Sequence, residues 1–301
     1  MNKALLIGSL LIASLLLLTN GASAASHSTE IQLNVNGINE TNYAPIISNN
    51  VVLVPIRTVS LIPKVNVSWN SKTKTVSVSE MGNKKNLQLI VGKETANIDG
   101  KLVPIGAKPT LRKGTVYVPF RFIGEAMNAQ VSWDNKTRTV VIYKTEENLL
   151  KALSSKKLDE ARSAAIQLPR ISLQKEALPP TEEGGNGGIF YFEYGGFDKF
   201  IYAYRGLAEY YEVKDGAAWM LWEGQVGSGK NNEVISNIMN VSGKEWGKRP
   251  LFKGKINFFW NQWRTSQVMY GTYDEKGESI FSELKDIPDG SKNIIFAIPG
   301  E

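Results

Sequence analysis

Basic side chains occupy the same two places in two similar hairpins of the N-terminal half. Lys72 and Lys74 lie at the tip of one hairpin, and Lys136 and Arg138 lie at the tip of the other. Such residues are usually only solvated, but a repeated pair of cations also attracts a polymer of negative charges. We therefore expect these four residues to be exposed, and they are our candidate contacts for a polyanion.

Four tryptophans of the C-terminal half form a second group that could bind a ligand. Trp219 and Trp222 are three positions apart, as are Trp260 and Trp263. On a strand this spacing places the two side chains on opposite faces, so one of each pair is expected in the core. The other could be a platform on which a sugar ring stacks. The alternative is that all four fill the core.

Carboxylates are the remaining groups that could carry out a reaction. Two of them, facing each other about 5–9.5 Å apart, hydrolyse glycosides, but spacing in the sequence does not show which two would face each other. The chain has no cysteine and one histidine, His27, which leaves no residue set for a thiol nucleophile or a histidine metal site. We expect no catalytic residue, metal or cofactor. The candidate carboxylates of a hydrolase are Glu193, Asp198, Glu209, Glu212 and Glu223.

The first 24 residues have the pattern of a secretory signal peptide. Lys3 precedes an apolar run over residues 4–18, and Ala22-Ser23-Ala24 is a small-residue cleavage site. The run is short for a membrane span, although an uncleaved anchor is the alternative. We expect an extracellular protein, in reach of the cell wall, that meets a membrane only during export and binds no nucleic acid.

Charge is unevenly distributed along the 301 residues. Residues 26–144 carry 15 Lys and Arg against 7 Asp and Glu, a balance of +8, whereas residues 145–301 carry 19 against 22, a balance of −3. The basic half suits an anionic cell-wall polymer as its partner.

The basic half contains an internal repeat. Each copy has a short strand, a proline that suits the start of a helix, and a hairpin that contains a tryptophan. We expect each arginine of the repeat to hold its helix start to a neighbouring strand, with contact to a ligand as the alternative. We expect each tryptophan to lie in the core. The motif residues recur at an offset of 64 positions: Pro55 and Pro119, Arg57 and Arg121, Trp69 and Trp133.

The two copies cover residues of about 30–80 and 86–143. Asn36-Gly37 and Asp99-Gly100 are the turn sequences that favour tight β-hairpins. We expect each copy to fold into a curved antiparallel sheet around one short helix.

These residues resemble the copper amine oxidase N-terminal, or stalk, domain, which is common in surface proteins of Gram-positive bacteria. The segments that carry the resemblance are Asp99-Gly100 and residues 117–126, 131–134 and 137–140, with residues 54–57 and 67–69 of the first copy. The resemblance implies a five-stranded sheet around a helix and a role as spacer or adhesion module. It does not imply oxidase chemistry, which needs three histidine ligands for copper and a quinone-forming tyrosine before an acidic residue. Here Tyr43 precedes Ala44.

The sequence after the repeats predicts three further segments. Residues 145–170 are typical of a helical hairpin, residues 171–188 of a linker, and residues 189–301 of a mainly antiparallel β domain that holds 22 of the 29 aromatic residues. The fold class expected is α+β, with tandem stalk-type modules, a helical hairpin and a β-rich C-terminal domain.

Three functions are compatible with these observations. The preferred one is a secreted, non-catalytic protein of the cell surface or cell wall, whose repeats bind the envelope or act as a spacer and whose C-terminal domain binds a glycan or a protein. The second is an extracellular hydrolase of envelope polysaccharide, targeted by the stalk. The third is a purely structural spacer, which a defined homo-oligomer would support.

Overall fold

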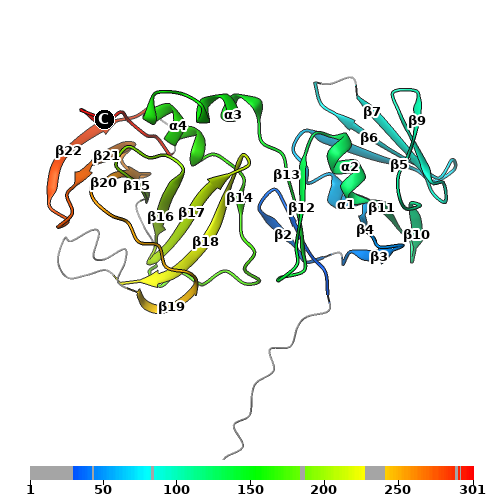
Figure 1. The fold of residues 1–301 in the computed structure, drawn as a ribbon, viewed down its shortest axis with the longest axis horizontal. Coiled ribbons are helices and arrows are strands. Elements are labelled where there is room, and N and C mark those ends of the chain that lie inside the picture. The colour runs from blue at the N-terminus through cyan, green and yellow to red at the C-terminus, as the bar shows by residue number, and fades with distance from the viewer. Residues whose placement is uncertain are drawn as a thin grey trace, which may run out of the picture.

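A computed structural model describes residues 30–42, 44–82, 85–183, 187–227, 241–288, 291 and 293–301. The segment expected to be a signal peptide, His27 and Tyr43 lie outside the described residues. Two bodies lie side by side in Figure 1, the N-terminal domain on the right and the C-terminal domain on the left. Among the described residues, no helix has the length and apolar character needed to cross a membrane.

The centre of the N-terminal domain is an antiparallel pair made of β4 (Val51–Pro55) and β11 (Thr115–Pro119). Val54 lies opposite Val118, which is its own equivalent in the repeat. The two copies are therefore related by an approximate two-fold axis between these strands. The flanking strands are β3 (Ile46–Ser48) and β10 (Thr110–Arg112), and the helices that follow the pair are α1 (Ile56–Val59) and α2 (Phe120–Ala126).

The expectation that each copy closes its own sheet is wrong, because strands are exchanged between the copies. One five-stranded sheet joins strands of the first copy, β5 (Val65–Asn70) and β6 (Thr75–Glu80), to strands of the second, β7 (Asn86–Ile90), β8 (Thr95–Ile98) and β9 (Lys101–Pro104). A four-stranded sheet joins β12 (Gln130–Asp134) and β13 (Thr139–Tyr143) of the second copy to β1 (Gln32–Val35) and β2 (Ile38–Glu40) of the first.

A single hydrophobic core results from this exchange. It includes Leu33 and Val76 from the first copy together with Leu89 and Ile142 from the second. The two sheets that join the copies are not equivalent. In the five-stranded sheet β7 lies between β6 and β8, whereas in the four-stranded sheet β13 pairs directly and in parallel with β1. Alternation of apolar residues defines the inner face of a strand but does not determine which strand pairs with it. This is why the expectation of one separate sheet per copy was wrong.

The C-terminal domain is built on one nine-stranded sheet, in which every pair is antiparallel except that of β14 with β18. The helices α3 (Glu147–Leu153) and α4 (Leu158–Ala165) precede it and lie along its upper side in Figure 1. The expected α+β fold class is thus confirmed. The strands are β14 (Arg170–Ile171), β15 (Gly187–Glu193), β16 (Lys199–Tyr204), β17 (Leu207–Lys214), β18 (Ala217–Val226), β19 (Val241–Gly247), β20 (Ile256–Gln262), β21 (Gln267–Tyr273) and β22 (Ser279–Asp286).

A buried ion pair fixes α4 to the sheet. The Arg162 and Glu301 side chains are 0% and 4% exposed, and Nη1 of Arg162 lies 2.6 Å from Oε2 of Glu301. The backbone N–H of Gly195 and the amide of Asn257 also donate to Glu301. The carboxylate is therefore well satisfied, which a buried charge requires.

The two domains contact each other along β13. Val141 and Tyr143 pack with Ile171 and Ala217 in one small cluster. The Tyr143 hydroxyl donates to the carbonyl of Asp215 at 3.1 Å. This contact brings the two domains together on one side of β12 and β13.

Candidate functional site

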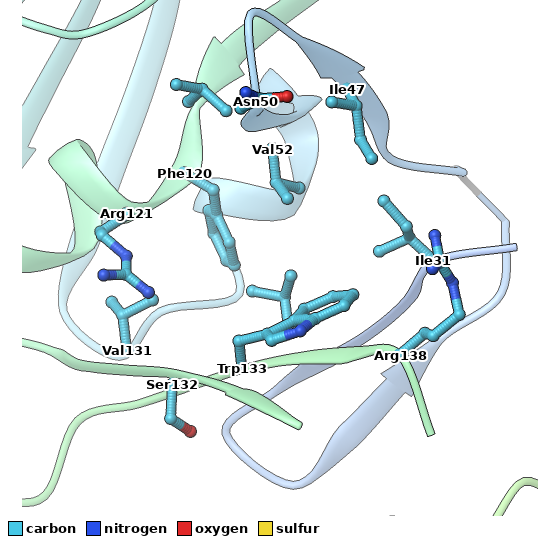
Figure 2. A pocket seen from close by; sticks show the side chains of 12 residues that line it. Ile31, Ile47, Asn50, Val52, Phe120, Arg121, Val131, Ser132, Trp133 and Arg138 are labelled. Carbon is cyan, nitrogen blue, oxygen red and sulfur yellow. The ribbon is translucent and has the colours of Figure 1, made fainter. Parts of the chain in front are cut away.

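The repeat builds a pair of surface hollows. The first, which we call the Trp133 hollow, has a volume of about 540 Å³ and is shown in Figure 2. Its lining residues are Ile31, Ile47, Asn50, Val51, Val52, Phe120, Arg121, Val131, Ser132, Trp133, Arg138 and Val140. The second, the Trp69 hollow, has a volume of about 380 Å³ and is lined by Ile56, Arg57, Ser60, Val67, Ser68, Trp69, Gly114, Thr115 and Val116.

The two hollows are equivalent under the repeat. Arg57 and Arg121, Ser68 and Ser132, and Trp69 and Trp133 all differ by 64 positions. The opposite wall comes from the other copy in each case. Residues 50–52 close the Trp133 hollow and residues 114–116 close the Trp69 hollow. Each hollow therefore needs both copies, and the same local sequence builds it twice.

The proline of each copy sets the position of the arginine. Pro55 and Pro119 are the last residues of β4 and β11 and the N-caps of α1 and α2. The fixed φ of proline turns the chain from strand to helix at this point. Arg57 and Arg121 then fall at the second helical position, beside the strand that carries the tryptophan.

The core position expected for Trp133 is wrong, since 39% of this residue is exposed, and Trp69 is only partly buried. Alternation along β12 does place Trp133 on the same face as Val131. A side-chain carbon added at Gly124 of α2 would lie 2.6 Å from Val131 and 2.5 Å from Ile142, so the helix packs over those two residues. The indole of Trp133 remains at the edge and forms a wall of the hollow (Figure 2).

The expected bonding of Arg121 to a neighbouring strand is also wrong. Arg121 is exposed, and its side chain makes no hydrogen bond or ion pair with any other residue that the structure describes. Arg57 lines the Trp69 hollow at the equivalent position. Both arginines thus line hollows, and Arg121 does not hold its helix to a neighbouring strand.

Arg138 departs from the exposure expected for the four hairpin cations. Lys72, Lys74 and Lys136 are exposed, but Arg138 is half-buried and lines the Trp133 hollow. Its Nε is buried and has no hydrogen-bond partner within the described chain. A buried, unpaired donor costs about 1–3 kcal/mol. No aspartate or glutamate lines either hollow, so the cations face no acidic side chain there.

Two of the C-terminal tryptophans do not form the expected opposite-facing pair. Trp219 lies opposite Glu212 and Trp222 opposite Tyr210, while Leu221 is the extra residue of a β-bulge. The Tyr210 hydroxyl donates to Glu212 at 2.7 Å, which places the four residues on one face. The bulge shifts the alternation by one residue, and this is why the expectation failed.

Burial removes most of these tryptophans from a binding role. Trp222 is 0% exposed, and its Nε1 donates to Glu245. Trp219 is half-buried against Tyr143 at the domain contact, with ring centroids 6.0 Å apart. Trp260 is also half-buried.

Trp263 differs from the other three. It is 40% exposed, and its ring lies 5.3 Å from that of Tyr204. The guanidinium of Arg205 lies 5.6 Å from the Tyr204 ring. Among the four candidates, this residue offers the most exposed aromatic surface of the C-terminal domain.

Among the five carboxylates, Glu209 and Glu223 do not form an open acid–base pair. Glu209 and Glu223 lie opposite each other on β17 and β18, but Glu223 is 1% exposed and accepts the backbone N–H of Leu178. Burial raises the pKa of Glu223, with a smaller contribution from the charge of Glu209. Glu209 accepts the Tyr211 hydroxyl. The other three carboxylates act on Tyr210: burial and the charges of Glu212, Glu193 and Asp198 raise the pKa of its hydroxyl, which donates to Glu212. Glu212 also lines a hollow of about 400 Å³ at the domain contact.

Sequence reasoning missed the second wall of each hollow. Asn50 and Val52, and their counterparts Gly114 and Val116, line the hollows. They share the 64-residue offset with the arginines and tryptophans, so the repeat itself was the available signal. What it could not show was that each wall faces the other copy.

Comparison with known families identifies the N-terminal domain. Residues 33–142 match the family model described as the copper amine oxidase N-terminal domain, and the rest of the chain matches no family. The part of the chain that holds both hollows is therefore a domain of this family. The match is to the N-terminal domain of those oxidases and not to their catalytic domain.

One curated relative is also similar. A protein named "Protease inhibitor" from Brevibacillus choshinensis is 32% identical over 143 residues, which is 46% of this chain and 43% of that protein. The match thus spans less than half the length of that relative.

Proposed function

We propose that the protein is a secreted, non-catalytic protein of the cell surface, whose N-terminal domain binds an anionic polymer of the cell wall. The observation that supports this best is the pair of equivalent hollows, each with one arginine and one tryptophan of the repeat and with no carboxylate. The net charge of +8 over residues 26–144 would also attract an anionic polymer, over a longer range than the contacts in the hollows.

The chemistry of each hollow suits a sugar that carries a negative group. An arginine guanidinium binds a carboxylate or a phosphate in a bidentate manner. An indole offers a flat apolar surface with a polar edge. Two such sites on one domain would bind a repeating polymer more tightly than either site alone, because the second contact becomes intramolecular.

The C-terminal domain would supply a separate surface for a glycan or a protein partner. Trp263 is the candidate that keeps an exposed face, with Tyr204 beside it. The other three tryptophans pack elsewhere: Trp219 at the domain contact, and Trp222 and Trp260 within the sheet. Hydrolysis has less support at Glu209 and Glu223, because Glu223 is buried and Glu209 accepts the Tyr211 hydroxyl.

The test is co-sedimentation of the mature chain with Gram-positive cell walls over a range of salt. We expect the wild type to pellet at low salt and the double variant Arg57→Ala/Arg121→Ala to remain in solution. The variant Lys93→Ala/Lys101→Ala removes the same charge from exposed positions outside both hollows and should still pellet. An equal loss of wall binding in both variants would show that the binding depends on the net positive charge and not on the hollows. If the wild type stays in solution, wall attachment is wrong and the spacer reading is favoured.

A second candidate, protease binding, is favoured by the relative named as a protease inhibitor. It predicts that the mature chain inhibits a secreted protease in proportion to its concentration. Titration of subtilisin and trypsin with the protein, followed by residual activity on a peptide substrate, decides it. Unchanged activity at a large molar excess would remove this candidate.

A further inference from the structure

We propose that the Trp133 hollow, and not its counterpart, is a selective site for one acidic sugar unit, a ring that carries a carboxylate or a phosphate. This inference rests on the proposed function, because it names the unit of the wall polymer that the N-terminal domain would bind. The sugar ring would lie along Trp133, and its anionic group would be held by Arg138, with the charge of Arg121 at the other end of the hollow.

The charge of the hollow is the first argument. Its twelve lining residues include Arg121 and Arg138 and no acidic residue. The two arginines stand at opposite ends of the hollow in Figure 2, with the indole of Trp133 between them. Neither side chain forms an ion pair with a residue that the structure describes, so an anion in the hollow would displace no internal partner.

The unpaired donor of Arg138 is the second argument. Its Nε–H is buried without an acceptor. Protein interiors leave such groups unpaired rarely, and an unpaired one is often completed by a ligand, ion or water. An anion that enters the hollow, with a rotation of the side chain toward it, would give the Nε–Nη edge its bidentate partner.

The difference between the two hollows is the third argument. The repeat equivalent of Arg138 is Lys74, which has the same left-handed backbone, with φ of 53° against 54°. Lys74 does not line the Trp69 hollow, which therefore has one cation and the smaller volume, about 380 Å³. Only the Trp133 hollow combines two arginines with the tryptophan, and its volume of 540 Å³ falls within the range of small-molecule sites.

The repeat also supplies a variant that should fold. Arg138→Lys places at position 138 the residue that position 74 already holds in the same conformation. It keeps the charge but removes the fork that binds an anion through two N–H groups. The matched control is Arg112→Lys, the same change at an exposed arginine that lines neither hollow.

The experiment is isothermal titration of the mature chain with three probes. These are trigalacturonic acid for the carboxylate, a sugar phosphate for the phosphate, and chitotriose as a neutral sugar. We expect at least one anionic probe to bind about tenfold or more tightly than chitotriose, and Arg138→Lys to weaken that probe about tenfold. Arg112→Lys should leave the affinity unchanged, and both variants should keep the wild-type melting temperature.

Three results would overturn the inference: equal affinity for the neutral probe, no binding of either anionic probe, or equal losses in the two variants. The cell-wall sedimentation separates this failure from that of the proposed function. Wild-type pelleting without selective probe binding would reject only the acidic-sugar site. Selective probe binding without pelleting would reject only the wall attachment.

Discussion

At the scale of single residues, burial separates tryptophans that the sequence presents as alike. Trp222 is fully buried, whereas Trp133 keeps 39% of its surface exposed at the edge of a hollow. We predict that Trp222→Ala lowers the free energy of unfolding by about 3–5 kcal/mol, and that Trp133→Ala lowers it by about 1 kcal/mol or less. Urea denaturation measures both. A loss for Trp133→Ala as large as that for Trp222→Ala would place Trp133 in the core after all.

The ion pair of Arg162 and Glu301 gives a prediction about pH. Burial alone would raise the pKa of the Glu301 carboxyl, but hydrogen bonds from Arg162 and Gly195, together with the charge of Arg162, lower it. A carboxyl with a lowered pKa in the folded state stabilises the fold above its unfolded pKa and loses this effect as the pH falls through the folded value.

We therefore expect Glu301→Gln to lower the free energy of unfolding by about 3 kcal/mol at pH 7. The difference from the wild type should shrink as the pH falls below the ordinary range of a glutamate pKa. Urea denaturation at pH 7 and in acid measures it. A difference that stays constant with pH would show that the charge of Glu301 contributes nothing.

At the scale of elements, the exchange of strands makes each copy of the repeat depend on the other. The β1–β2 hairpin pairs with β13, and β6 pairs with β7. We predict that a fragment of residues 26–82 is unfolded by itself, because its strands lose the neighbours that cover their edges and faces. Amide dispersion in NMR spectra would show this, and residues 26–144 are the folded control. A well-dispersed spectrum of the short fragment would contradict the exchange.

The turns of the two equivalent hairpins provide a comparison at the scale of the whole molecule. Gly37 and Gly100 both have φ of +89°. A side-chain carbon at Gly37 would lie 2.4 Å from the carbonyl oxygen of Arg170 in the C-terminal domain, but one at Gly100 would meet nothing within 4 Å. An alanine would therefore suffer the same backbone strain at either position, but only at Gly37 would its side chain also clash with the other domain.

We predict that Gly100→Ala lowers the stability by about 1 kcal/mol and that Gly37→Ala lowers it further and weakens the domain contact. Scanning calorimetry of the two variants would show the difference, with a single transition in Gly100→Ala and a broader or divided one in Gly37→Ala. Identical transitions in both variants would show that the contact at Arg170 contributes little.

The sequence by itself determined what depends on neighbouring residues. Asn36-Gly37 and Asp99-Gly100 turn hairpins because these residues accept positive φ, and both hairpins are present. Proline ends β4 and β11 and starts the helices, again for a local reason. The 64-residue offset also identified the motif residues, since a repeat is a property of the order of residues alone. The resemblance of those residues to a known family then suggested the stalk-type domain.

The tertiary structure decided everything that depends on a distant partner. Alternation fixes which face of a strand is apolar, but the exchange of β1 and β7 between copies depends on how both copies pack. The hollows follow from that exchange, because each has walls from both copies. The exposure of Trp133 and the buried Nε of Arg138 follow in turn, since burial is set by the atoms that surround a side chain in space and not by its position in a strand or turn.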